Sequence, residues 1–225
     1  MLRGVAQRTL GGTPLIEPAS EEEKTGYLAG FADEFGRPHP ADRPLLARLL
    51  GIDPGPIPNP APDPAHALLW ALHDPASDPD SLIRPAAPQA SPPHPTPPTP
   101  LLYDPADSSV AIEWRTLDEL TALHALWNLA TLRTDPALRA RCLNAARWHV
   151  AELQPDNATN HPWAIHVFIE LAEAEENPSE AAAARFHAET LLHSCQVKLS
   201  KADLVSACIL LDAANTLDTL DTKSV

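Results

Sequence analysis

From Thr116 to the C-terminus, hydrophobic residues recur every three or four positions in five successive stretches. Three of these stretches are TLDELTALHALWNLATLR, DPALRARCLNAARWHVAEL and PSEAAAARFHAETLLHSCQVKL. A spacing of three or four places apolar side chains on one face of an α-helix, whereas a half-buried β-strand alternates at every second residue. No stretch of the sequence shows convincing alternation, so the pattern predicts an all-α protein.

Two of these helices begin at a polar residue followed by proline, at 135–136 and at 177–178, which are 42 positions apart. A capping residue followed by proline is typical of a helix N-terminus. The same shift places His124 over His166, and repeating it places His166 over Cys208. The sequence therefore predicts a short array of antiparallel helical hairpins, an α/α repeat of about 40 residues per unit whose members pack against their neighbours.

The pentapeptide Ala-Ala-Arg-aromatic-His occurs twice, at 145–149 and at 183–187. His149 and His187 both fall on the apolar face of their predicted helices. A histidine in this position is typically a core residue whose ring N–H bonds a carbonyl oxygen. We therefore interpret the doubled motif as repeated packing rather than as a doubled active site.

Three shorter helices are predicted in the N-terminal half. Ser20 and Glu23 form a capping box that predicts a helix over about 21–35. The pattern over 44–51, which starts with proline and ends with glycine, predicts a short second helix. AHALLWALHD at 65–74 predicts a third.

Proline divides the chain into parts. Eight of the sixteen residues in 85–100 are prolines, which disfavours helices and sheets and favours an extended linker. Such a segment is also a typical ligand of proline-binding domains. The predicted parts are a small helical N-terminal segment at 1–52, a proline-rich linker with one short helix at 53–110, and a helical-hairpin repeat domain at 111–225.

Charge and composition restrict the partners. The formal net charge is −14 and no basic block is present, so nucleic acid and anionic membranes are not expected as partners. No apolar run approaches the ~20 residues of a membrane span, and the N-terminus lacks the apolar stretch of a signal peptide. The three cysteines lie inside helical patterns without a CxxC motif, which indicates reduced thiols and a cytoplasmic protein.

A row of polar residues is the first candidate site. His124, His166 and Cys208 are each followed, four positions later, by a polar residue. These polar residues are Asn128, Glu170 and Asp212, respectively. A spacing of four places each pair on one helical face, so the row predicts either a polar groove or hydrogen bonds between helices. If the three helices stack in sequence order, the outer members lie about 20 Å apart, too far to share one metal ion.

The connection QPDNATNHPWAIH at 154–166 is the second candidate site. Its polar and aromatic residues are suited to carbohydrate binding, and they are Asp156, Asn157, Asn160, His161 and Trp163. They are equally suited to a structural turn in which Asn160 or His161 caps a helix opened by Pro162. No phosphate-binding loop, dinucleotide motif, nucleophile elbow or metal motif is recognisable. We name no catalytic residue and expect neither a cofactor nor a metal.

Hairpins that start with proline, such as DPALRARCLNAARWHV with the polar loop QPDNATNHPW, resemble the α/α-toroid proteins. These include six-hairpin glycoside hydrolases and terpenoid-cyclase-like proteins, and the resemblance covers about residues 116–218. It implies a ring of about six hairpins around a central cleft with acidic residues. The chain has two and a half clear hairpins, so we transfer no catalytic residue from these families.

The sequence favours a protein-interaction or scaffolding module with a protein partner over an enzyme. A toroid-type enzyme or carbohydrate-like small-molecule binder is the alternative, and it would gather five residues around one pocket: Asp156, His161, Trp163, His166 and Glu170. A third hypothesis is an adaptor whose proline-rich segment 85–100 is a docking ligand. The predicted helix at 202–217 lacks a hairpin partner, so we expect it to pack on the N-terminal segment or on another subunit.

Overall fold

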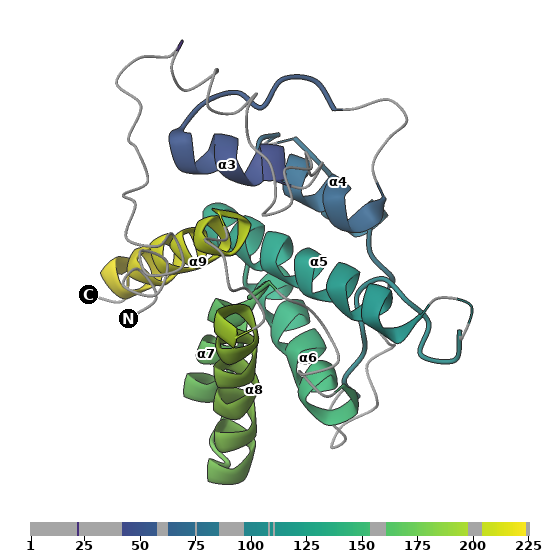
Figure 1. Ribbon diagram of the computed structural model, residues 1–225. Coiled ribbons are helices and arrows are strands. Elements are labelled where there is room, and N and C mark those ends of the chain that lie inside the picture. The colour runs from purple at the N-terminus through teal and green to yellow at the C-terminus, as the bar shows by residue number, and fades with distance from the viewer. Residues whose placement is uncertain are drawn as a thin grey trace.

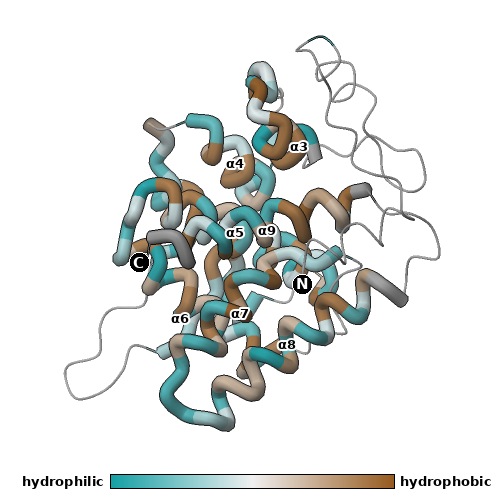
Figure 2. Tube along the Cα trace, turned by 90° about the vertical axis from the view of Figure 1, so that its left-hand side faces the viewer, coloured by the Kyte–Doolittle hydropathy of each residue, from teal (hydrophilic) through white to brown (hydrophobic). Residues whose placement is uncertain are grey.

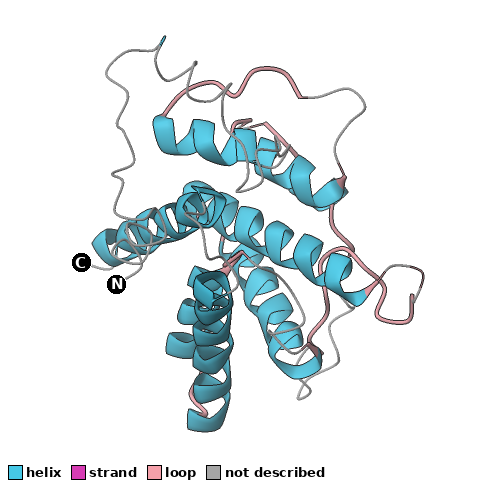
Figure 3. Cartoon of the chain, viewed as in Figure 1, coloured by secondary structure: helices cyan, strands magenta, loops and turns pink. Residues whose placement is uncertain are grey.

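The described part of the computed structural model comprises residues 22, 42–57, 63–74, 76–85, 97–107, 109, 111–153, 161–197 and 204–223. It contains a 3-10 turn, η1 (Pro79–Ser81), and seven α-helices: α3 (Asp42–Leu50), α4 (Pro64–Ala71), α5 (Ile112–Arg133), α6 (Pro136–Glu152), α7 (Ile165–Ala174), α8 (Pro178–Val197) and α9 (Leu204–Lys223). The described residues contain no β-strand (Figure 3). The all-α prediction is confirmed for this part of the chain, while the predicted helix 21–35 lies outside it apart from Glu22.

The helices form three layers around α5 and α9 (Figure 1). Helices α3 and α4 lie on one side, where α3 packs on α9 and α4 packs on α5. On the other side α6 folds back against α5, and α7 pairs with α8. Helix α9 corresponds to the predicted helix at 202–217, which has no hairpin partner. Its packing on α3 agrees with the expectation that this helix contacts the N-terminal segment.

The helix starts follow from local capping. The Asp135 carboxylate accepts hydrogen bonds from the N–H groups of Ala137 and Leu138, each at 3.0 Å, at the start of α6. At the start of α8 the Asn177 side chain accepts one from the N–H of Ser179 at 2.9 Å. Both predicted proline-marked starts are confirmed, because short polar side chains satisfy N–H groups that have no partner within the helix.

Thr134 ends α5 in the left-handed conformation, with φ 55° and ψ 45°. A β-branched residue is strained there, whereas glycine and asparagine adopt this conformation readily. We expect Thr134→Gly to raise the free energy of unfolding by about 0.5–1 kcal/mol in urea titrations. The same change at Thr190, inside α8, should lower it by about 0.3–0.5 kcal/mol; stabilisation at both positions or at neither would contradict the argument.

One hydrophobic core runs through all three layers. Buried leucines of α3 and α4, among them Leu46 and Leu69, belong to the same cluster as Leu123 of α5 and Ile209 of α9. Figure 2 shows hydrophobic, brown stretches on α3 and α4. The division of the chain into three domains stays a prediction, and the described helices on both sides of the proposed boundaries share this core.

His149 and His187 are core residues, with 0% and 3% of their surface exposed. The predicted bond from a ring N–H to a carbonyl is wrong for His149. Neither of its ring nitrogens has a hydrogen-bond partner among the described residues. Its surroundings are aromatic instead, with Trp148, Phe168 and His187 at ring-centroid distances of 5.2, 6.1 and 6.4 Å.

Candidate functional site

A buried polar cluster joins four helices around the carboxylate of Asp212. We call it the Asp212 cluster, and its members are Arg48, His124, Asn128, His166, Asp212 and Thr216. The carboxylate accepts hydrogen bonds from His124 Nε2 at 3.0 Å, Asn128 Nδ2 at 2.5 Å and Arg48 Nε at 2.8 Å. Asp212 is 1% exposed, and His124 and Asn128 are 0% exposed. The cluster therefore links α3, α5 and α9 inside the core.

Asn128 extends the cluster to α7. Its carbonyl oxygen accepts a hydrogen bond from the Thr216 hydroxyl at 2.7 Å and contacts His166 Nε2 at 3.2 Å. His166 Nε2 therefore carries the proton. His166 Nδ1 has no partner among the described residues. The three side chains fix the register of α5, α7 and α9 through polar contacts in an apolar interior.

The hydrogen bonds also define the charges in the cluster. His124 Nδ1 accepts the backbone N–H of Ala164 at 3.3 Å, so its Nε2 donates to Asp212. Burial and the neighbouring His124 lower the pKa of His166 well below its ordinary value. Burial raises the pKa of Asp212. The hydrogen bond from His124 and the charge of Arg48 lower it by more than burial raises it, so the net shift of the pKa is downward. The cluster thus holds one carboxylate, paired with one guanidinium and hydrogen-bonded to the His124 imidazole.

The expected polar row is only partly correct. Asn128 and Asp212 are directly bonded, so the expectation that the outer members lie about 20 Å apart is wrong. The reason is that α9 returns to pack against α5 and α7 instead of extending the array outward. Glu170 lies outside the cluster, on the α6 side of α7, and its carboxylate is 3.7 Å from Arg139. The described residues contain no group of three or more His, Cys, Asp or Glu side chains that could hold a metal.

Within the 154–166 connection, the structure describes residues 161–166. Helix α7 begins at Ile165, after a left-handed Ala164 and without a side-chain cap, so the helix start predicted at Pro162 is wrong. His161 Nδ1 contacts the Ser206 hydroxyl of α9 at 3.0 Å. Trp163 is 2% exposed and packs edge-on against His124 at 5.2 Å.

Asp156, Asn157 and Asn160 lie outside the described residues. Of the predicted pocket residues, the structure places Trp163 and His166 in the core beside His124, while Glu170 lies apart from them at the surface.

A segment without helix or strand, residues 97–103, lies on α5 and α6, and side chains from both helices bind its backbone. Asn144 of α6 accepts the Thr99 N–H at 3.0 Å and donates to the Pro97 carbonyl at 3.2 Å. Arg141 of α6 donates to the carbonyls of Thr99 and Pro100 at 2.9 and 2.5 Å. The segment is thus held through its main chain, as a bound peptide would be.

Glu119 of α5 holds the second half of this segment. Its carboxylate is 1% exposed and accepts the backbone N–H groups of Leu101, Leu102 and Tyr103 at 2.7, 2.7 and 2.8 Å. Burial raises the pKa of Glu119, and the three N–H donors oppose that rise. The carboxylate replaces the backbone partners that a strand would have provided.

We expect Glu119→Gln to lower the free energy of unfolding by about 2 kcal/mol, because an amide NH2 cannot accept the Leu101 N–H that the carboxylate binds. Urea unfolding measures the loss, and hydrogen exchange at residues 101–103 should accelerate. Glu113→Gln, at an exposed position of the same helix, is the control and should change stability by less than about 0.5 kcal/mol. An unchanged stability in Glu119→Gln would contradict the role of the carboxylate.

Two hollows flank the 97–103 segment on the surface of α6. The first, the α6–α8 groove, has a volume of about 750 Å3 and is lined by Pro97, Pro98, Asn144, Arg147, Val150, Ala151, Leu171, Glu175, Ser179, Glu180 and Ala183. The second, the Trp148 hollow, has a volume of about 430 Å3 and is lined by Pro98, Tyr103, Asp104, Pro105, Ile112, Arg115, Thr116, Glu119, Trp148, Glu152 and Leu153. Both share Pro98 as a wall, so together with the segment they form one surface, which we call the α6 surface.

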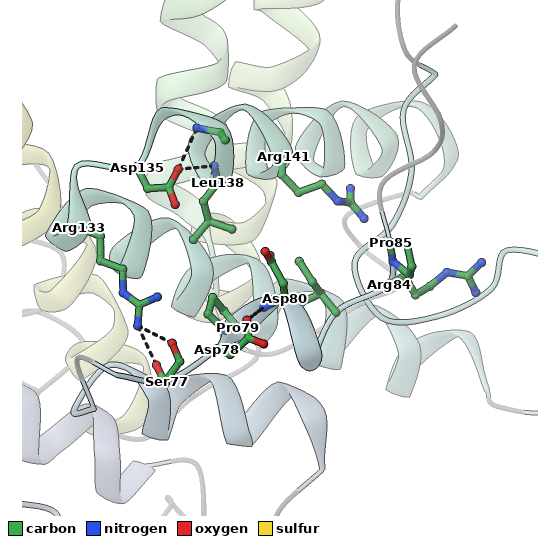
Figure 4. A pocket seen from close by; sticks show the side chains of 12 residues that line it. Ser77, Asp78, Pro79, Asp80, Arg84, Pro85, Arg133, Asp135, Leu138 and Arg141 are labelled. Atoms are coloured by element: carbon green, nitrogen blue, oxygen red, sulfur yellow. Dashed lines mark hydrogen bonds between the residues drawn. The ribbon is translucent and has the colours of Figure 1, made fainter.

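A third hollow of about 630 Å3 lies where η1 meets the end of α5 and the start of α6 (Figure 4). Several of its charged groups are engaged within the protein. Arg133 donates to the carbonyl and hydroxyl of Ser77, both at 2.9 Å, and the Asp135 carboxylate caps α6. Arg84 pairs with Asp104 at 3.2 Å. These side chains stabilise the junction of the layers.

Sequence reasoning missed the residues that form the α6 surface. Asn144, Arg147, Trp148 and Ala151 follow one another at intervals of one to four, so they share the face of α6 opposite to the buried stripe. That mixture of an amide, a guanidinium and a large aromatic ring on an exposed face is a usable signal. Comparison of the chain with known protein families, curated proteins and solved structures finds no match.

Proposed function

We propose that this chain is a protein-interaction module and that the α6 surface is its binding surface. The observation that supports the proposal is the 97–103 segment, whose backbone is bound by side chains of α5 and α6 without any strand or helix partner. A helical surface that holds one segment in this way, with a hollow on either side of it, is suited to hold a second segment from a partner.

The α6–α8 groove has the chemistry of a peptide site. Val150, Ala151, Leu171 and Ala183 provide apolar lining. Arg147 at its edge pairs through Nε with Glu175 at 2.5 Å, and its other guanidinium N–H groups have no partner among the described residues. An apolar floor with a few polar groups at the rim is the usual composition of protein interfaces.

Filling the groove tests the proposal. Ala183→Trp places a large side chain in the groove at an exposed position, whereas Ala182→Trp adds the same bulk beside it without lining the groove. In quantitative affinity capture we expect a set of proteins recovered by the unmodified chain and by Ala182→Trp to be depleted about tenfold or more with Ala183→Trp. Equal recovery with all three chains, at equal melting temperatures, would contradict the proposal.

A second candidate, the adaptor, is supported by one contact. The Arg84 N–H donates to the Leu101 carbonyl at 2.7 Å, so the two ends of the proline-rich segment 85–100 lie side by side. The residues between, 86–96, lie outside the described part. Replacing 86–96 by a short glycine-serine linker should leave the melting temperature unchanged, and it abolishes partner binding only if the segment itself is the ligand.

We place this interaction in the cytoplasm. The support is that Cys142, Cys195 and Cys208 are all buried thiols that form no disulfide, as in a protein kept in a reducing compartment. None of the described helices is long and apolar enough to cross a membrane.

A further inference from the structure

The Trp148 hollow has a lining that differs from that of the α6–α8 groove. Two half-buried aromatic rings, Trp148 and Tyr103, line it together with Pro98 and Pro105. Flat aromatic and proline surfaces of this kind pack well against pyrrolidine rings, and proline-rich ligands are bound by aromatic-lined grooves in several unrelated domains.

The two aromatic side chains of this hollow differ in whether their hydrogen-bond donor is already bonded within the protein. The Tyr103 hydroxyl donates to the Asp118 carboxylate at 2.5 Å and is therefore committed. The indole N–H of Trp148 has no hydrogen-bond partner among the described residues, and it is not among the buried polar atoms. A proline-rich segment has free carbonyl oxygens but few N–H groups, so a surface-accessible donor beside aromatic rings suits it.

The charge at the rim favours a basic ligand. Two surface carboxylates line the hollow: Asp104, which already pairs with Arg84 at 3.2 Å, and Glu152, which is the one placed to meet a basic ligand. Its one guanidinium, Arg115, donates to the Asp107 carbonyl. The chain as a whole carries a formal charge of −14, which adds to the negative potential at this site.

We infer that the Trp148 hollow binds a proline-rich segment of the partner protein in the polyproline II conformation, with a basic residue next to the prolines. The inference rests on the proposed function and adds the chemistry of the ligand. The pyrrolidine rings pack between Trp148 and Tyr103, the Trp148 indole N–H donates to a ligand carbonyl, and the basic side chain lies against Glu152. A polyproline II ligand loses little conformational entropy on binding, because it is extended before it binds.

The experiment uses the full chain labelled with 15N and a synthetic octaproline peptide that ends in two arginines. The five tryptophans give five indole N–H signals in NMR spectra, and we expect that of Trp148 to shift progressively with added peptide. Trp148→Phe keeps a ring against His149 but removes the donor, and it should weaken binding about tenfold. Trp114→Phe is the matched control, because Trp114 is 65% exposed on α5 and does not line the hollow; it should leave affinity unchanged.

Charge is tested separately. The same peptide ending in two glutamates should bind about tenfold more weakly than the arginine peptide, and Glu152→Gln should reduce that difference. The inference is overturned if the Trp148 signal does not move at millimolar arginine peptide, if Trp114→Phe weakens binding as much as Trp148→Phe, or if both peptides bind equally well. If the peptide fails while Ala183→Trp still depletes partners, the ligand class is wrong and the proposed function stands. If both fail, the α6 surface is not a binding surface.

Discussion

Replacing Asp212 with asparagine is expected to lower the free energy of unfolding by about 3–5 kcal/mol. The carboxylate is 1% exposed and is the common acceptor for His124, Asn128 and Arg48. An asparagine of the same size removes the negative charge and turns one acceptor into a donor that faces other N–H donors. The Arg48 guanidinium then remains partly buried without a counter-ion, which is the costly outcome when one member of a buried pair is removed.

Urea unfolding followed by far-ultraviolet circular dichroism measures this loss. Asp218→Asn, at an exposed position of the same helix, removes the same charge and should change stability by less than about 0.5 kcal/mol. A double-mutant cycle with Arg48→Gln should give a coupling energy of about 1 kcal/mol or more between the two residues. A loss below about 1 kcal/mol for Asp212→Asn would show that the cluster does not hold α3, α5 and α9 together.

Acidification from pH 7 to pH 5 is expected to destabilise the fold by several kcal/mol. Burial lowers the pKa of His149 to about 3, that of His187 to about 4, and that of His166 well below its ordinary value. An unfolded chain has histidine pKa values near ~6.5, so below that pH the unfolded state binds protons that the folded state does not. The stability that these neutral histidines contribute is therefore fully present above about pH 6.5 and is lost as the pH falls toward about 3–4. At pH 5 the loss is about 2 kcal/mol per histidine.

The carboxylates with raised pKa values, Asp118 and Glu119, act in the opposite direction, because their folded forms take up protons first as the pH falls. The histidine contribution can be isolated with His149→Phe. This ring fits an aromatic site and removes two unpartnered nitrogens, so the variant should be at least as stable as the unmodified chain at pH 7. Between pH 6.5 and 5, unfolding of this variant should take up about one proton fewer than unfolding of the unmodified chain. The slope of the free energy of unfolding against pH should therefore fall by about 1.4 kcal/mol per pH unit. An unchanged slope would contradict the assignment.

Local sequence signals predicted most of the helices, and for the last one they left two packing partners open, the N-terminal segment or another subunit. Starts such as Asp135 at α6 and Asn177 at α8 depend on neighbours in the chain, and the structure confirms both. The position of α9 depends on Arg48, which is 164 positions away from its partner Asp212. Repeat periodicity favours stacking in sequence order and contains no information about a helix that returns to the start of the array. The polar row was therefore identified correctly at Asn128 and Asp212 but misplaced in space.

The contacts between the α6 surface and residues 97–103 could not be predicted, because the side chains bind backbone groups. Glu119, Arg141 and Asn144 contact main-chain groups of residues 97–103, and backbone groups leave no pattern in the sequence. Besides the outer face of α6, Glu119 carried a usable signal. It lies on the buried face of α5 together with Leu120 and Leu123, and a carboxylate among core leucines requires several donors.

The most direct test of the α6 surface as a binding surface is site-specific photocrosslinking in cells that contain the partner. A benzophenone amino acid at Ala151 lies in the α6–α8 groove, and the same group at Leu132, which is 54% exposed on α5, is the control outside it. The account predicts covalent adducts with a defined partner at Ala151 that are absent at Leu132 and are lost when Ala183→Trp is added. No adduct at Ala151, or equal adducts at both positions, would contradict the claim that this surface binds a protein.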